Sequence, residues 1–394
     1  MNRLVANGVT GITPDDLPPR QPTPGKTRML FISSVILGFR RYAEYLERFT
    51  AERDDIDAVH IHIKIPQLVR YASATWPLPG GWDFHSYRYL LLSDMFIRRW
   101  FARRLDPDCF DLIHWITQGN AKPIHAIKRR SDVKHVVNID TTSILDLTEY
   151  NYSPLARKPF IAAERRIFDA ADGVVCRNHW ASHSLRDDFR MPDSKIIVAP
   201  NSIDLPDQDA WSADAQAKRA GSLPRLVFVG NDWERKGADT LLRVHQEQFA
   251  DRAELHFFGD RHKRNDSAKN VVWHGRQDHD RVLNEFLPTM DIFVFPTLED
   301  MMPWAIIEAA SVGLPCIVSK MAAIPDVVLH EKSGLCIPPG DAASLSGAIE
   351  RLLEDAALRE QYGRAARAHI EAEFNANRMY PMLIDRLCEI AGAG

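Results

Sequence analysis

Residues 293–319 read Phe-Val-Phe-Pro-Thr-Leu-Glu-Asp-Met-Met-Pro-Trp-Ala-Ile-Ile-Glu-Ala-Ala-Ser-Val-Gly-Leu-Pro-Cys-Ile-Val-Ser, and this stretch decides the fold. The apolar run 292–295 predicts a short buried strand of a parallel sheet. Pro303 suits the first turn of a following helix, where its missing N–H costs nothing. Gly313 and Pro315 are typical of a helix end, and the apolar residues after them predict a second strand. Strand, loop, helix and strand in this order predict an α/β protein.

Two carboxylates in this stretch stand eight residues apart, Asp300 in the loop and Glu308 inside the helix. Backbone N–H groups at the helix start, around Met302, would face the same crevice. Amides suit phosphate and carboxylates suit hydroxyls, so the pattern fits a sugar diphosphate. A second interpretation makes Asp300 a helix cap and Glu308 a solvated surface group, and the spacing alone does not separate the two.

The composition of the chain indicates a globular protein of two domains, with three as the alternative. Its 394 residues are more than a domain with one hydrophobic core usually contains. A content of 45% hydrophobic and 26% charged residues is usual for soluble proteins. A formal net charge of −4 gives no sign of a nucleic-acid partner. Without a long apolar run or an apolar leader, we expect neither a membrane span nor secretion. Five cysteines without a C-x-x-C pair predict reduced thiols, a cytoplasmic protein and no metal site.

The first half of the chain alternates predicted strands and helices after a proline-rich start. Residues 1–27 carry five prolines and few large apolar residues, so we expect a flexible tail. Residues 28–204 are expected to form a Rossmann-like domain, with strands near 29–33, 59–65, 111–116, 133–139, 172–177 and 195–199. For an aromatic and arginine-rich helix at about 86–104, packing on its own domain is favoured over a peripheral membrane contact.

Two positions that follow strands of this half are candidate site residues. Gly38 lies between the first strand and a helix, as in a turn that approaches phosphate, although a plain turn is the favoured interpretation of a single glycine. Asp140 ends the strand 133–139. By its position alone it would cap the next turn, and a role at a ligand site is implied only by the family resemblance described below.

The second half opens with a strand, 225–229, that runs into Gly230 and Asn231. Arg235 and Lys236 follow at the mouth of the predicted parallel sheet, where ligands of such sheets bind. A guanidinium and an ammonium group there can neutralise a diphosphate, whereas solvated charges would be the ordinary role of such a pair.

Further strands are predicted at 255–258 and 271–274, and the second runs into Gly275 and Arg276. Residues 222–373 are therefore expected to form a second Rossmann-like domain, and 374–394 a final helix.

The opening stretch resembles the acid-x7-acid signature of family-4, GT-B-type retaining glycosyltransferases, the glycosyl transferases of group 1. Residues 308–315, Glu-Ala-Ala-Ser-Val-Gly-Leu-Pro, are similar to that family's helix and turn. Residues 200–204, Pro-Asn-Ser-Ile-Asp, resemble its link between domains, and Lys236 matches a lysine of its phosphate turn.

Three positions depart from the family pattern. Asp300 stands where the first acid is usually Glu, with Glu299 directly before it. Asn231 stands where an Arg usually follows the glycine, and Asp140 where many relatives carry a His. These departures leave open which of the two adjacent acids contacts the sugar.

The resemblance implies a GT-B fold, which consists of two doubly wound α/β domains that face a cleft. Residues 28–204 would form the acceptor-side domain and 222–373 the domain that binds the nucleotide sugar. The last segment, 374–394, would cross back to the first domain.

The activity that the resemblance implies is that of a retaining glycosyltransferase of the hexosyltransferase class, EC 2.4. A sugar would move from a nucleotide donor, such as a UDP- or GDP-sugar, to a glycan, a lipid-linked acceptor or a small molecule. No cofactor or metal ion is expected. The protein is expected in the cytoplasm, with the inner face of the membrane as an alternative place.

Relatives also imply roles for the individual residues. The first acid, Asp300 with Glu299 as the alternative, would hold the sugar hydroxyls, and Glu308 would hold the ribose. Lys236 and Arg235 would bind the leaving diphosphate together with the backbone near the helix start.

The remaining candidates lie around the donor. Gly38, Gly230 and Asn231 would lie near the diphosphate, Arg276 near the nucleotide base and Asp140 near the reacting sugar. Two other functions remain open from the sequence: a nucleotide-sugar epimerase of the same fold class, and a GT-B protein that binds a ligand without catalysis.

Overall fold

The structure of the chain is a computed structural model. It describes residues 25–34, 37–63, 92, 95–99, 101, 106–150, 154–207, 210–212, 221–260 and 268–392. The expected tail up to residue 24 and the loop expected at 76–82 lie outside these residues. Of the helix expected at 86–104, only residues 92, 95–99 and 101 are described, and these are helical.

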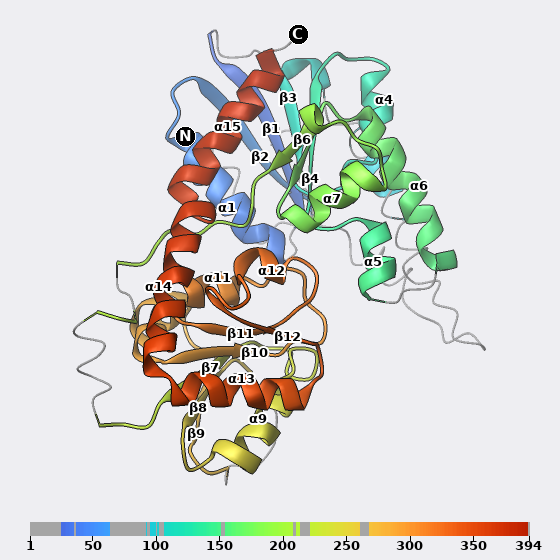
Figure 1. Ribbon diagram of the computed structural model, residues 1–394. Helices are drawn as coiled ribbons and strands as arrows, with labels where there is room; N and C mark the ends of the chain where they lie inside the picture. The colour runs from blue at the N-terminus through green and yellow to red at the C-terminus, as the bar shows by residue number, and fades with distance from the viewer. Residues whose placement is uncertain are drawn as a thin grey trace. The chain divides into compact units, whose positions relative to one another are not determined.

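The chain forms two compact units (Figure 1). Unit 1 comprises residues Met1–Ala199 and Arg378–Gly394, and unit 2 comprises Pro200–Asn377. The division between them falls just before the Pro200–Asp204 segment, and the C-terminal residues belong to the same unit as the N-terminal half.

Unit 1 is built on a six-stranded parallel sheet in the order β2-β1-β3-β4-β5-β6. Its strands are β1 (Thr27–Ser34), β2 (Ile56–Ile63), β3 (Leu112–Trp115), β4 (Lys134–Ile139), β5 (Gly173–Cys176) and β6 (Ile196–Val198). Strands β3 and β5 are buried at every residue, as expected for a parallel sheet covered on both faces.

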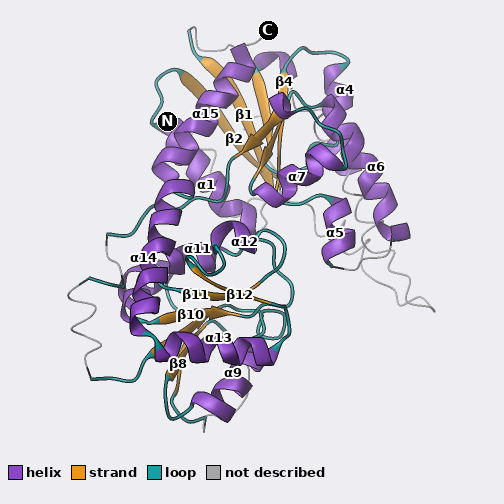
Figure 2. Cartoon of the chain, in the orientation of Figure 1, coloured by secondary structure: helices purple, strands orange, loops and turns teal. Residues whose placement is uncertain are grey.

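Helices flank this sheet (Figure 2). They are α1 (Leu37–Ala51), α4 (Ile124–Lys128), α5 (Ser143–Glu149), α6 (Pro154–Ala170), α7 (His179–Asp187) and α15 (Ala376–Gly392). Helices α1 and α15 pack together through aromatic rings, because Tyr380 stacks on Tyr45 and Phe49 at centroid distances of 5.0 and 5.4 Å. Short 3-10 turns, η2 (Pro107–Cys109) and η3 (Asp193–Lys195), precede two of the strands.

Unit 2 contains a second six-stranded parallel sheet in the order β12-β11-β10-β7-β8-β9. Its strands are β7 (Arg225–Val229), β8 (Glu254–Phe258), β9 (Val271–Gly275), β10 (Ile292–Phe295), β11 (Cys316–Ser319) and β12 (Gly334–Ile337). The order reverses between β7 and β10, which makes their carboxyl ends the topological switch point where doubly wound sheets bind ligands.

The connections of unit 2 are mostly helical. They comprise α9 (Ala238–Val244), α10 (His279–Arg281), α11 (Trp304–Ser311), α12 (Ile324–Val327), α13 (Ala342–Glu354) and α14 (Ala356–Glu373), with the π-helical segments η4 (His245–Phe249) and η5 (Val282–Phe286) and the 3-10 turn η6 (Leu287–Thr289). Gly313 takes a left-handed φ of +80° after α11, which only glycine adopts at little cost, so the helix end predicted from the sequence is confirmed.

The predicted α/β class, with a doubly wound parallel sheet in each half, is confirmed. Some predicted boundaries are wrong. Strand β2 begins three residues earlier than the predicted residue 59, because its first residues are less apolar but still pair with β1. Gly38 lies within the first turn of α1 rather than in a loop before it. No helix in the described part of the chain is both long and apolar enough to span a membrane.

Candidate functional site

The loops at the switch point of unit 2 bring together the charges that the sequence singled out. Arg235 and Lys236 follow β7, and Asp300 follows the adjacent strand β10. The two loops approach closely at Gly237, whose φ is +73°. A Cβ on this glycine would lie 2.0 Å from the carbonyl oxygen of Pro296. Only glycine therefore allows this approach of the two backbones.

Asp300 joins the two cations. Its Oδ2 lies 3.2 Å from Nη1 of Arg235 and 3.4 Å from Nζ of Lys236. The Oγ1 of Thr297 donates a hydrogen bond to the same oxygen at 3.3 Å. The Lys236 and Asp300 side chains are only 16% and 17% exposed, so water screens this pair less than a surface ion pair. Lys236 Nζ also lies 4.7 Å from the centroid of the Phe295 ring.

Arg235 has further partners that hold the loop after β10. Its Nε donates to Asp232 at 2.7 Å, and its Nη1 donates to the carbonyl of Glu299. Its own carbonyl accepts the Leu298 N–H at 2.7 Å, and this backbone contact fixes the two loops to each other. These contacts allow Arg235 to hold the two loops together. Arg235 forms ion pairs with both Asp232 and Asp300, whereas the ion pair of Lys236 is with Asp300.

The start of α11 differs in detail from the sequence prediction. Pro303 is the residue before the helix, with extended φ and ψ of −64° and 131°, and not part of its first turn. No side chain caps the helix, so the interpretation of Asp300 as a helix cap is wrong. Met302 is buried and lies two residues before the first helical residue, Trp304.

Glu308 lies inside α11 and is only 6% exposed, so the alternative of a solvated surface group is wrong. Its Oε1 lies 2.9 Å from Nε2 of His279, which begins the short helix α10 after β9. A carboxylate only accepts hydrogen bonds, so the imidazole Nε2 is the donor in this contact.

Close backbone contacts at glycines and polar side-chain contacts connect the ends of β7, β8 and β9. Gly259, after β8, has a φ of +136°, and a Cβ there would lie 2.0 Å from the carbonyl oxygen of Gly230. Asn231 accepts the Asp260 N–H through its Oδ1 at 3.3 Å, and Arg276 pairs with Asp260 at 2.7 Å. Gly230, Asn231 and Arg276, which were expected near the diphosphate and the base, thus belong to adjoining loops of one sheet edge in unit 2, whereas Gly38 lies in unit 1.

Asp140 in unit 1 directly follows β4 and is half-buried. Its carbonyl oxygen accepts a hydrogen bond from Nδ2 of Asn178 at 2.8 Å. Thr142, not Asp140, caps α5, since the Thr142 Oγ1 accepts the Leu145 N–H at 3.3 Å. The capping interpretation of Asp140 is therefore wrong for the helix that follows.

A buried carboxyl group supports the loop that carries Asp140. Glu164 of α6 accepts the N–H of Ser143 at 2.9 Å and its Oγ–H at 2.8 Å. Burial raises the pKa of Glu164 to about 7, and the hydrogen bonds from Ser143 act in the opposite direction. Gln118 adds a hydrogen bond from its Nε2 to the carbonyl of Thr141 at 3.0 Å.

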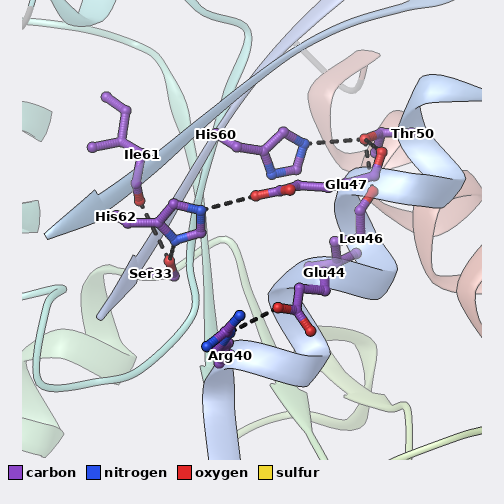
Figure 3. Close-up of polar contacts among 9 residues, drawn as sticks. All are labelled: Ser33, Arg40, Glu44, Leu46, Glu47, Thr50, His60, Ile61 and His62. Carbon is purple, nitrogen blue, oxygen red and sulfur yellow. Dashed lines mark hydrogen bonds and ion pairs between the residues drawn. The ribbon is translucent and has the colours of Figure 1, made fainter. Parts of the chain in front are cut away.

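A second polar cluster of unit 1 connects α1 with β1 and β2 (Figure 3). Glu47 accepts from Nε2 of His62 at 2.9 Å, and Nδ1 of His62 is hydrogen-bonded to Ser33. This order of groups is that of a nucleophile, base and acid. Ser33, however, is only 2% exposed, so its hydroxyl is buried against the imidazole and is not presented to a substrate. The cluster fastens the helix to the sheet.

The sequence reasoning missed His279 and Thr297, both of which contact predicted site acids. Thr297 stands three residues before Asp300, and this short spacing was a signal in the sequence. His279 is 29 residues before Glu308, and no local pattern connects the two.

Comparisons with known proteins give the class of the chain. The family model described as "Glycosyltransferase Family 4" matches residues 71–206, and that described as "Glycosyl transferases group 1" matches residues 223–355. The two matches follow each other along the chain and cover most of both units. The chain belongs to the group 1, family-4 glycosyltransferases of the GT-B fold, as the sequence resemblance predicted.

Among curated relatives, the amylovoran biosynthesis glycosyltransferase AmsK of Erwinia amylovora is 36% identical over 115 residues, which is 28% of each chain. The sequence match thus spans less than a third of that relative. Among solved structures, sucrose-phosphate synthase of Thermosynechococcus elongatus matches with a TM-score of 0.68 at 17% identity, over 94% of this chain and 100% of that one.

A further solved structure, HepE of Anabaena in complex with UDP and glucose, matches with a TM-score of 0.63 at 14% identity. The match covers 92% of this chain and 99% of that one. At such low identities these structures show the fold, and they confirm the predicted GT-B architecture.

Proposed function

We propose that this glycosyltransferase transfers a sugar, with retention of the anomeric configuration, from a nucleoside diphosphate sugar to a hydroxyl of an acceptor. The proposed donor is a UDP- or GDP-sugar, and the proposed acceptor is a glycan, a lipid-linked saccharide or a small molecule. The observation that carries the proposal is the charge cluster of Lys236, Arg235 and Asp300 at the switch point of unit 2.

A diphosphate donor suits this cluster because its leaving group carries the charge that the cations can neutralise. The ammonium group of Lys236 acts as a point charge. It lies on a loop that is in close contact with the loop after β10, because Gly237 allows the approach to Pro296. Stabilising the charge that develops on the departing phosphate is usually the largest catalytic term in such a site. The HepE complex with UDP and glucose supports a uridine nucleotide as the first donor to test.

The acids of the cluster suit the sugar and the ribose. Asp300 lies beside the cations and is the proposed contact for the sugar hydroxyls, and Glu308 on α11 is the proposed contact for the ribose. Glu299 is exposed on the same loop and remains the alternative for the sugar. Asp140 is the acid that unit 1 is proposed to contribute.

No metal ion is part of the proposal. Among the described residues, no three His, Cys, Asp or Glu side chains are arranged to hold a metal ion. We instead assign the neutralisation of the diphosphate to Lys236, with Arg235 holding the loop in place.

The proposal is tested by incubating the full chain with a panel of UDP- and GDP-sugars and with saccharide and lipid-linked acceptors. Release of nucleoside diphosphate that requires an acceptor, with a product whose anomeric configuration matches the donor by NMR, is the expected result. An epimerised nucleotide sugar formed without acceptor would instead identify an epimerase. Tight nucleotide binding without any turnover would identify a binding protein.

A further inference from the structure

We propose that His279 is a positioning residue of the donor site, which holds the carboxylate of Glu308 in the orientation that receives the ribose hydroxyls. The inference rests on the proposed function, because it assumes a nucleoside diphosphate donor. It adds a residue that the sequence pattern did not indicate and that lies outside the pair of acids eight positions apart.

The contact between the two residues joins connections that begin at different strands. His279 begins α10, four residues after the end of β9, whereas Glu308 lies on α11, which follows β10. In the sheet, β7 and β8 lie between β9 and β10. Three strand spacings amount to roughly 14 Å, so the 2.9 Å contact requires the segment after β9 to return toward the switch point.

Local hydrogen bonds fix His279 in this place. Asp278 caps the short helix by accepting the N–H groups of Asp280 and Arg281 at 3.0 and 3.4 Å. Gln277 donates from its Nε2 to the carbonyl of His274 at 2.6 Å, which ties the turn to the end of β9. The imidazole is therefore presented to Glu308 by a turn that is itself held at both ends.

The physical need for such a partner follows from burial. Glu308 is 6% exposed, and a buried carboxylate is costly unless a donor or cation satisfies it. The His279 side chain is 46% exposed, so the imidazole reaches the carboxylate from the solvent side. A carboxylate has about four lone-pair positions for hydrogen-bond donors, and Nε2 of His279 occupies one of those of Glu308.

These observations give His279 a defined task. Its hydrogen bond restrains the side-chain rotation of Glu308 before a ligand arrives. The two vicinal ribose hydroxyls then meet a carboxylate that is already oriented, and less side-chain entropy is lost on binding. The contribution of His279 should therefore depend on the ribose hydroxyls of the ligand.

The test uses the full chain and isothermal titration calorimetry with UDP and 2′,3′-dideoxy-UDP, or with GDP and its dideoxy analogue if the wild type prefers guanine. His279→Ala is expected to weaken binding of the ribonucleotide up to about 10-fold, because the side chain of Glu308 then has to be ordered when the ligand binds. It should change the affinity for the dideoxy analogue less than about 2-fold, because that ligand has no hydroxyl for Glu308 to hold.

Two matched variants complete the test. His279→Gln keeps a side-chain N–H donor and should recover most of the affinity for the ribonucleotide. Glu285→Gln changes an exposed group of the neighbouring turn η5 that pairs with Arg281, and it should leave both affinities unchanged. In steady-state assays, His279→Ala should raise the donor KM and leave kcat nearly constant.

The outcomes separate this inference from the proposed function. Equal losses for the ribonucleotide and the dideoxy analogue, or none for either, would overturn the role of His279 while the donor assignment stands. A wild-type chain that binds no nucleoside diphosphate would overturn the proposed function and this inference with it.

Discussion

The carboxyl edges of the two sheets carry acidic side chains in different environments. In unit 1, Glu164 is surrounded by backbone and hydroxyl donors, and burial raises its pKa to about 7. In unit 2, Asp300 lies against two cations, and Glu308 lies against an imidazole. Both sheets are parallel and doubly wound, although among the described strands the order reverses between β1 and β3 in unit 1 and between β7 and β10 in unit 2.

The difference teaches that similar sheets position groups for different purposes. A buried carboxyl group that accepts hydrogen bonds from a loop can hold that loop in place. Glu164 does so for the loop that carries Asp140, through the N–H and the hydroxyl of Ser143. Where a carboxylate pairs with cations, as Asp300 does with Lys236 and Arg235, an anionic ligand can take the place of the carboxylate as the partner of the cations. The chemistry therefore belongs to the loops and not to the fold as such.

The strongest test of this comparison is Lys236→Ala. Removing the ammonium group should lower kcat/KM about 100- to 1,000-fold, in line with the loss of one group that stabilises a developing anion. Initial rates at varied donor concentration measure the change. Arg243→Ala on the exposed face of α9 is the matched control, and an unchanged kcat/KM in Lys236→Ala would remove this residue from the site.

The two adjacent acids give the next test. Asp300→Asn is expected to lower transfer about 10- to 100-fold, because its charged contact with the sugar is lost in the transition state. Binding of the free nucleoside diphosphate should not weaken, since the substitution also removes the carboxylate that competes for Lys236 and Arg235. Calorimetry measures this binding.

Glu299→Gln is the companion variant, and it should have a mild effect on transfer because the Glu299 side chain is exposed. If Glu299→Gln were the more damaging of the two, the sugar contact would be shifted by one residue along the loop.

Asp140 tests whether unit 1 contributes to the chemistry. Asp140→Asn should lower kcat about 10-fold and leave the affinity for nucleoside diphosphate unchanged, because its proposed contact is the reacting sugar and not the nucleotide. Unchanged kcat would leave the catalytic charges to unit 2 alone. Circular dichroism of the variant checks that the loop after β4 still folds.

The pH dependence of stability tests the buried acid of unit 1. The pKa of Glu164 is raised from 4.5 to about 7 in the folded chain, so the folded state keeps its proton longer than the unfolded state does. This contribution to stability is fully present below about pH 4.5 and is lost as the pH rises through about 7. In wild type the free energy of unfolding should fall between about pH 5 and pH 8, and Glu164→Gln should reduce this fall by a few kcal/mol. Urea unfolding at each pH measures the change.

The smallest expected effect is that of removing divalent ions. EDTA should leave the transfer rate unchanged, because Lys236 is assigned the charge neutralisation that a metal ion would otherwise supply. Loss of activity in EDTA with recovery in Mg²⁺ or Mn²⁺ would show that the cations of unit 2 are insufficient by themselves.

Local sequence determined the fold class and most elements of unit 2. The strand 292–295 and the glycine after α11 follow from an apolar run and from turn residues that act within a few positions. The acids at 300 and 308 and the cations at 235 and 236 were also visible, because each follows a strand that the pattern predicts.

Only the tertiary structure decided which of these groups meet. Asp300 contacts residues 64 and 65 positions earlier, and Glu308 contacts His279 across two intervening strands. Such contacts depend on the strand order and on the close approach of Gly237 to Pro296, neither of which leaves a local pattern in the sequence. Apolar periodicity reports burial of each element, whereas the pairing of charges depends on how the sheet places the ends of its strands.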